Sequence, residues 1–215
     1  MTKLPTILTP RKSPVQRRSQ VTVDAIHIAT IQVLTKEGLV RCTTTRIAER
    51  AGVSVGTLYQ YYADRHALLA AALSRHISRI VAAVEASCRH LHGAPLDVMA
   101  SGLVEAFLAA KFEDAAEAKA LYAVSEDYGG PVIVNDASER MTAAIAVMLA
   151  SAPGIEIAEL DVVSQMVGIA VSAPARAVLT APSPVPMQDR LVEHCTQLVL
   201  SYLNAVSRPV SGLGD

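Results

Sequence analysis

TTTRIAERAGVSVGTLYQYY, residues 43–62, contains the signals of two short helices and of the turn between them. Thr43 or Thr44 can cap a short helix, and Gly52 ends it because only glycine enters the left-handed conformation without a steric cost. Ser54 can cap a second short helix after a connection of three residues. The residues spaced to pack inward from the two segments are Ile47, Ala48, Val53 and Leu58. Two short helices joined by a tight, glycine-containing turn are typical of a helix-turn-helix.

Upstream of this stretch the sequence predicts one more helix. Apolar residues recur at helical spacing from about Val21, and Gly38 follows as a stop signal. Residues 1–20 contain prolines and basic residues without apolar periodicity, so we expect a flexible basic arm that ends at Arg17 and Arg18. The head is then expected over residues 21–66.

Downstream, Asp64 can cap a long fourth helix that continues to about His90. Glycines and prolines separate the remaining segments, and no segment has the two-residue period of a strand. The further helices are expected at about 95–110, 114–128, 131–151, 156–180 and 187–206. The sequence therefore predicts an all-α protein, with an N-terminal three-helix helix-turn-helix head and a helical body over residues 67–215. Pro174 is expected to kink the helix that contains it.

Composition excludes several classes of protein. Hydrophobic residues make up 51% of the 215 residues and charged residues 18%, which excludes a disordered chain. The longest apolar stretch, Val162 to Ala173, has about 12 residues, whereas a membrane span needs roughly 18 or more. The N-terminus lacks the apolar segment of a signal peptide, and three widely spaced cysteines fit a reducing compartment. We expect a cytoplasmic protein that does not span a membrane.

Charge is unevenly distributed along the chain, although the formal net charge is only −1. Residues 1–65 contain ten Lys or Arg and four Asp or Glu, a formal charge of +6, whereas residues 66–215 carry −7. Because neutralised phosphates supply most non-specific nucleic-acid affinity, the basic N-terminal third favours binding to a polyanion. Small domains also differ in charge by chance, so charge alone leaves this function open.

Together, residues 43–62 and the following Ala67-Leu68-Leu69 resemble the DNA-binding domain of the tetracycline-repressor (TetR) family. The resemblance covers about residues 21–70, and the rest of the chain matches only the family's general layout of helices. It implies a three-helix head, a fourth helix linking the head to a ligand-binding body, and a last pair of long helices that associate across a dimer axis. The implied partners are double-stranded DNA, a second copy of the chain and an unidentified small apolar ligand, without a cofactor.

The resemblance also implies which residues contact DNA. Val55, Gly56 and Gln60 correspond to base-facing positions of the recognition helix, while phosphates would be held by hydroxyl and basic side chains. Glutamine can present a paired donor and acceptor to adenine. The whole predicted set is Arg17, Arg18, Thr44, Arg46, Ser54, Val55, Gly56, Thr57, Tyr59, Gln60, Tyr61 and Arg65. Tyr59 is alternatively a packing residue, and the two arginines of the arm are alternatively part of a solvated tail rather than a minor-groove contact.

The last two long helices are apolar on two faces, which favours packing against both their own domain and a second subunit. The predicted dimer interface comprises Val163, Ala170, Ala177, Leu191, Leu198 and Tyr202. The predicted ligand-binding residues are large apolar side chains of the middle helices together with one methionine of the penultimate helix: Met99, Leu103, Phe107, Tyr122, Met141, Met148 and Met166. Such stripes are alternatively plain core, and only the resemblance favours a pocket.

Other functions find less support. Cys88 and His92 lie one helical turn apart, but no further Cys/His pair completes a tetrahedral zinc set, so no metal site is predicted. The chain has no Gly-rich phosphate loop, zinc motif or serine elbow, so we predict that it is not an enzyme. The prediction is a ligand-responsive, homodimeric regulator of transcription, most simply a repressor. The alternative is an adaptor that keeps the head without specific DNA recognition.

Overall fold

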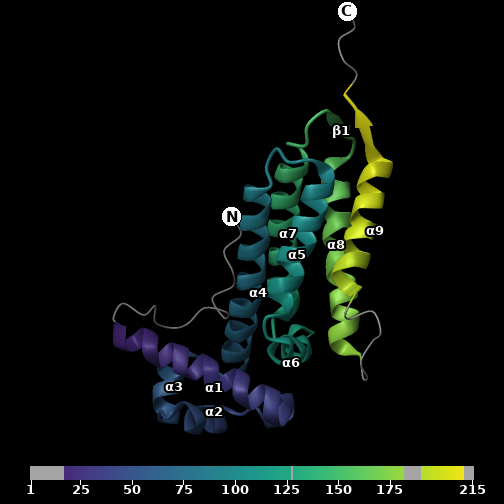
Figure 1. Cartoon of the computed structure of the whole chain (residues 1–215). Coiled ribbons are helices and arrows are strands. Elements are labelled where there is room, and N and C mark those ends of the chain that lie inside the picture. Colours follow the sequence, from purple (N-terminus) through teal and green to yellow (C-terminus); the bar gives the residue numbers. More distant parts are fainter. Residues whose placement is uncertain (1–16, 127, 182–189, 211–215) are drawn as a thin grey trace, which may run out of the picture. The chain divides into compact units, whose positions relative to one another are not determined.

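The computed structural model describes residues 17–126, 128–181 and 190–210, and these residues form nine helices and one two-stranded sheet. The helices are α1 (Arg17–Arg41), α2 (Thr44–Ala51), α3 (Val55–Tyr61), α4 (Arg65–His90), α5 (Leu96–Phe112), α6 (Ala115–Ser125), α7 (Gly130–Leu149), α8 (Leu160–Thr180) and α9 (Leu191–Val206). The predicted all-α class is confirmed (Figure 1). The chain divides into two compact units, here called the head unit, which includes the residues up to Ile77 and Ala116–Val134, and the body unit, Ser78–Ala115 with Asn135 onward.

The head unit is built around the predicted helix-turn-helix. Thr43 caps α2 by accepting a hydrogen bond from the N–H of Arg46, and Gly52 ends the helix with a left-handed backbone, φ 69°. Ser54 caps α3 by accepting from the N–H of Thr57 at 2.9 Å. Both short helices and their glycine stop are confirmed. The fully buried side chains that the head unit contributes to one core include Ile26, Ile47, Leu58, Leu68, Leu69 and Leu121.

The first helix differs from the prediction at its beginning and end, whereas the fourth helix, Arg65–His90, agrees with it. Helix α1 begins at Arg17, so the last residues of the predicted arm are helical, whereas residues 1–16 lie outside the described residues. Gly38 interrupts α1 with φ 78°, as the predicted stop requires, although helical turns continue to Arg41. Asp64 caps α4 by accepting from the N–H of Ala67 at 2.8 Å, which confirms the predicted cap.

A buried polar pair joins α4 to α6 inside the head unit. Nδ1 of His76 lies 3.3 Å from Oε1 of Glu117, and both side chains are nearly inaccessible to solvent. Burying a carboxylate requires polar partners, because desolvation disfavours the charge. This pair therefore fixes α6 against the first half of α4, next to apolar contacts made by Leu121 and Val124.

The body unit has its own core, in which α5 packs against α8 and α9 (Figure 1). Its fully buried members include Met99, Met148 and Leu203. Pro174 lies inside α8, and the helix continues on both sides of it. The prediction of no strands is wrong at one place: β1 (Ile155–Ile157) pairs antiparallel with β2 (Ser207–Pro209).

Two described helices, α4 and α8, are long and apolar enough to satisfy a length-and-hydropathy test for a membrane span, with mean hydropathies of 1.4 and 1.5 in their most apolar windows. Core helices of water-exposed proteins satisfy the same test. Both helices supply buried side chains to the cores, among them Leu68 and Leu69 of α4 and Val167 and Val171 of α8. Their apolar character is thus explained in part by packing within the chain.

Replacing Glu117 should destabilise the head unit. Glu117→Ala removes the buried carboxylate that faces His76, and a buried polar group that loses its partner typically costs about 1–3 kcal/mol. We expect a lower urea midpoint, measured by the helical circular dichroism signal. The control is Lys119→Ala, an exposed change on the same helix. Equal midpoints for the two variants would show that the buried pair contributes nothing to stability.

Candidate nucleic-acid interface

Helix α3 divides its side chains between the core and the surface. Leu58 and Tyr61 are buried, and the intervening Tyr59 and Gln60 are exposed, as expected where successive residues of a helix point about 100° apart. The predicted contact residue Tyr61 therefore belongs to the core, with 9% of its surface exposed, and we exclude it from the interface. The exposed face of α3 presents a phenol, an amide and, one turn earlier, the half-buried Thr57.

A hydrogen bond between hydroxyl groups orients Tyr59. Its phenolic oxygen lies 3.2 Å from Oγ1 of Thr44 at the start of α2, while 42% of the residue remains exposed. The ring is thus neither a core residue nor a free surface side chain. Because a hydroxyl can both donate and accept, the same oxygen can still bind an oxygen outside the protein. This geometry brings two of the predicted contact residues, Thr44 and Tyr59, together at one surface.

The start of α3 is a second hydroxyl cluster. Oγ of Ser54 lies 2.8 Å from Oγ1 of Thr57, in addition to capping the helix. Between them Gly56 is exposed, and a Cβ built there would meet only the Ser54 hydroxyl at an ordinary contact distance of 3.7 Å. Packing within the chain therefore does not require a glycine at this position. Val55 is half-buried beside the head core.

Three basic residues, two of them predicted DNA contacts, have partners within the head. Arg46 forms an ion pair with Glu37, and Nε of Arg50 donates to the amide oxygen of Gln32 at 2.6 Å. Arg65 differs from the prediction of a phosphate contact, because its guanidinium donates to the carbonyl oxygens of Cys42 and Leu39. It thereby closes the end of α1 onto the start of α4, a structural role. The side chains of Arg17 and Arg18 lie outside the described residues.

Two known families match this chain. Residues 26–72 match "Bacterial regulatory proteins, tetR family", and residues 95–203, half of the chain, match "Tetracyclin repressor-like, C-terminal domain". The chain belongs to the TetR family. Members of this family are DNA-binding transcriptional regulators rather than enzymes, often respond to small molecules, and act as dimers.

Solved structures with the same fold are distant in sequence. A protein assigned to the TetR family from Mesorhizobium loti superposes with a TM-score of 0.70 at 20% identity, covering 91% of this chain and all of that one. A transcriptional regulator from Rhodococcus sp. Rha1 superposes with a TM-score of 0.69 at 16% identity, covering 87% of this chain and 98% of that one. The multidrug binding protein EbrR, solved in complex with imidazole, superposes with a TM-score of 0.61 at 16% identity, covering 90% of this chain and 98% of that one. These similarities support the fold alone.

Curated relatives match a smaller part of the chain. The nucleoid occlusion factor SlmA of Actinobacillus pleuropneumoniae serotype 5b is 32% identical over 85 residues, which is 40% of each chain. That of Haemophilus ducreyi is 31% identical over 96 residues, 45% of this chain and 46% of its own. The matched regions thus span less than half the length of these relatives.

The TetR body exposes large apolar side chains on its last two helices, which lie side by side (Figure 1). Val162, Met166 and Ile169 form an exposed stripe on α8, and Leu198, 51% exposed, lies on α9. Val163 and Leu191, both predicted to lie at the dimer interface, are buried in the subunit's own core instead. Of the other predicted interface residues, Ala177 is exposed, and Ala170 and Tyr202 are half-buried. Met166, predicted to line the ligand pocket, lies on this exposed stripe.

Three of the predicted ligand-binding residues line one small cavity in the described part of the chain. Leu103, Phe107 and Met141 meet there, together with Ile145 and Val171, and the cavity has a volume of only about 10 Å³. That space holds no more than a water molecule. Met99 and Met148 are fully buried in the body core, and Tyr122 belongs to the head unit.

Substitutions at Tyr59 and Gln60 should have different effects on DNA binding. Tyr59→Phe removes a hydroxyl suited to phosphate and should weaken binding to all duplexes alike. Gln60→Ala should reduce discrimination at one base pair of each half-site by roughly 1–3 kcal/mol. Affinities for a set of single-base operator variants, measured by fluorescence anisotropy, separate the two effects.

A loss of thermal stability in Tyr59→Phe with unchanged DNA affinity would instead assign Tyr59 to packing, through its hydrogen bond to Thr44. The melting temperature of each variant is therefore measured beside its affinity.

Proposed function

We propose that this TetR-family protein is a ligand-responsive repressor that binds an inverted-repeat operator as a homodimer and is released by a small, largely apolar molecule. Its place of action would be the cytoplasm, where the DNA is. The observation that carries the proposal is the outer face of α3, where Tyr59 and Gln60 stand exposed on a head that is rigidly capped and basic.

Three features of the head support specific DNA binding. The caps at Thr43 and Ser54 each satisfy one backbone N–H at the start of α2 and α3, which fixes where the two helices begin. Gly56 is not required by packing, which fits a position where a partner approaches the backbone closely. The first 65 residues carry a formal charge of +6, which favours electrostatic attraction to the DNA phosphates. Val55, Gly56 and Gln60 are the proposed base contacts, and Thr44, Thr57 and Tyr59 the proposed phosphate contacts.

The exposed apolar side chains of α8 and α9 support the homodimer. Val162, Met166 and Ile169 follow the spacing of one face of α8, and Leu198 is a further large apolar side chain exposed on α9. Exposed apolar faces of this kind are typical of association surfaces. A two-fold dimer would bury the same surface on both subunits and place two heads for two half-sites.

A second candidate function follows from the names of the curated relatives. They are nucleoid occlusion factors, so we consider as the alternative a protein that binds the nucleoid at many places and does not control one promoter. Selection of bound fragments from a genomic DNA pool distinguishes the two functions. A repressor should enrich one or a few sites beside promoters, whereas a chromosome-marking protein should enrich many sites without a promoter.

The DNA-binding proposal predicts a protected palindrome with strong salt dependence. Footprinting on the selected fragment should show two half-sites related by two-fold symmetry. The logarithm of affinity should fall with the logarithm of salt concentration with a slope of about −0.9 per neutralised phosphate. Failure to protect any palindrome at any salt concentration would remove this proposal in favour of an adaptor without specific recognition.

The homodimer proposal predicts that Leu198→Asp shifts the protein toward monomer. Because Leu198 is exposed in the single subunit, the change should leave the body core intact while placing an unpaired charge in the interface. Sedimentation velocity at micromolar concentration measures the shift. Gln197→Asp, the same new charge on the adjacent exposed residue, is the matched control and should remain dimeric. A dimeric Leu198→Asp would place the interface elsewhere.

A further inference from the structure

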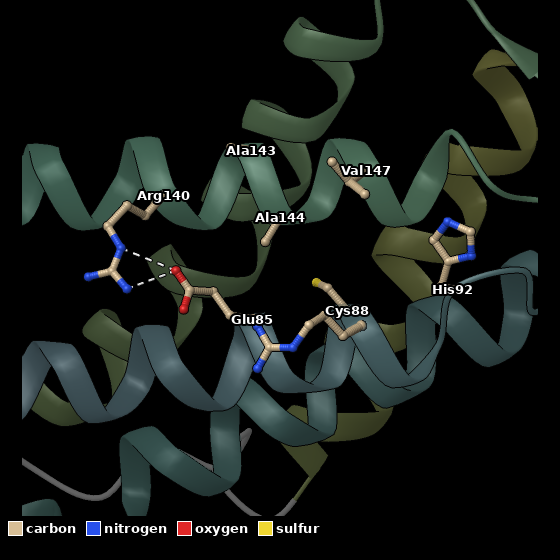
Figure 2. A pocket seen from close by; sticks show the side chains of 8 residues that line it. Glu85, Cys88, His92, Arg140, Ala143, Ala144 and Val147 are labelled. Carbon is tan, nitrogen blue, oxygen red and sulfur yellow. Dashed lines mark hydrogen bonds and ion pairs between the residues drawn. The ribbon is translucent and has the colours of Figure 1, made fainter. Parts of the chain in front are cut away.

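A surface groove lies between the C-terminal half of α4 and helix α7, with a cavity volume of about 510 Å³. Pockets that hold small organic molecules have volumes of roughly 300–1,000 Å³. All of its lining residues belong to the body unit. Figure 2 shows Glu85 and Cys88 projecting from α4 toward α7, with Ala144 facing them and His92 at one end.

One ion pair crosses the groove. Arg140 of α7 donates to Oε1 of Glu85 from Nη2 at 2.8 Å and from Nε at 3.1 Å (Figure 2). Burial raises the pKa of the Cys88 thiol to about 11, so this thiol is neutral at physiological pH. Cys88 thus adds a polarisable, uncharged surface between the charged groups.

The groove contains one more guanidinium than carboxylate. Arg89 lines it, and within the described part of the chain Arg89 has no hydrogen bond or ion pair. Arg140 is balanced by Glu85, whereas the charge of Arg89 is not balanced by a second acidic residue of the lining. The excess of one positive charge suits a monoanion. A dianion would in addition face repulsion from Glu85.

The wall on the α7 side is apolar. It is formed by Ala143, Ala144 and Val147, and 63% of the Val147 surface is exposed. An occupant that covers this wall would remove apolar surface from water, which is the main source of affinity for small ligands. The excess positive charge and the apolar wall on the α7 side together favour a ligand with one anionic end and an apolar body.

We propose that this groove binds an amphipathic carboxylate, an organic acid whose carboxylate is held by Arg89 and whose apolar body covers Ala143, Ala144 and Val147. A guanidinium matches a carboxylate because its planar N–H groups donate to both oxygens. The proposal names a ligand class for the regulator proposed above and rests on that function for its biological role. It also places the ligand outside the predicted pocket, because Leu103, Phe107 and Met141 line only a small cavity, whereas the groove is open to the surface.

The position of the groove explains how such a ligand would act on the head. Helix α4 is continuous from Arg65 to His90. Its early residues Leu68 and Leu69 belong to the head core, and its late residues line the groove. A ligand inserted between α4 and α7 would alter the spacing of these two helices, and a continuous helix would transmit that change.

The test compares decanoate with 1-decanol, which has the same chain length without the charge, by isothermal titration calorimetry on the full-length protein without DNA. We expect decanoate to bind more tightly than decanol by about two- to fivefold, as an ion pair with an exposed guanidinium such as that of Arg89 provides. Arg89→Gln should remove that advantage and leave decanol binding unchanged. The matched control is Arg79→Gln, which removes the same charge from an exposed position of α4 outside the groove.

A steric variant tests the apolar wall separately. Ala143 is exposed, so Ala143→Phe should fill the groove without entering the core, and it should abolish binding of both probes while the melting temperature stays unchanged. Equal affinities for decanoate and decanol, or equal losses in Arg89→Gln and Arg79→Gln, would overturn the proposed site. Decanoate binding that survives Ala143→Phe would overturn it as well.

The failure of the site and the failure of the proposed function can be distinguished. The titrations contain no DNA, so they decide the groove even if the protein binds no palindrome. With an operator in hand, decanoate should lower operator affinity in the wild type and have no effect in Ala143→Phe. Decanoate that binds in an Arg89-dependent manner and leaves operator affinity unchanged would show that the groove is not the regulatory site.

Discussion

The backbone turn at Gly52 is the constraint on which the recognition surface depends. Its φ of 69° lies in the left-handed region, and beyond its chain neighbours no atom lies within 4 Å of where a Cβ would be. The cost of any other residue there would come from the local clash of its Cβ with the following carbonyl oxygen, not from packing against the rest of the head. The N–H of the next residue, Val53, donates to the Ala48 carbonyl at 3.0 Å, so the chain turns immediately after α2 toward α3. Ile47 and Leu58 then meet in one core, and Tyr59 and Gln60 are left outside.

Features that act over a few residues could be predicted from the sequence. The caps at Ser54 and Asp64 are local, since each capping side chain accepts a hydrogen bond from a backbone N–H three residues further on. The glycine stops are local as well, because each depends on the backbone conformation of one residue. Arg65 could not be interpreted in this way. Its carbonyl partners lie 23 and 26 positions earlier, so a conformation that only the folded head creates determines its role. A basic residue at the start of a helix otherwise resembles a phosphate contact.

The apolar residues of α8 show a second limit of sequence interpretation. The helix carries two apolar stripes, one containing Val163, Val167 and Val171 and the other containing Val162, Met166 and Ile169. Both follow helical spacing, and composition does not say which one meets the subunit's own core. The prediction therefore mixed the two, assigning Val163 to the dimer and Met166 to the ligand. Exposure in the folded subunit separates them, because only one stripe can face α5 and α9.

The groove could not be predicted for a related reason, since Glu85, Arg89 and Arg140 look like solvated helix charges until α4 and α7 are placed together.

The energetics indicate which part of a ligand would matter most. Arg89, which would hold the carboxylate, is exposed, and ion pairs at exposed positions contribute about 0–1 kcal/mol, too little to drive a typical coupling of about 1–3 kcal/mol. The apolar body must therefore provide most of it. At about 25 cal/mol per Å², a difference of roughly 40–120 Å² in buried apolar area between the two states of the protein is sufficient. An aliphatic chain lying along Ala143, Ala144 and Val147 can supply an area of that size, whereas a bare carboxylate such as acetate cannot. This is the physical reason why an effector of this groove must be amphipathic.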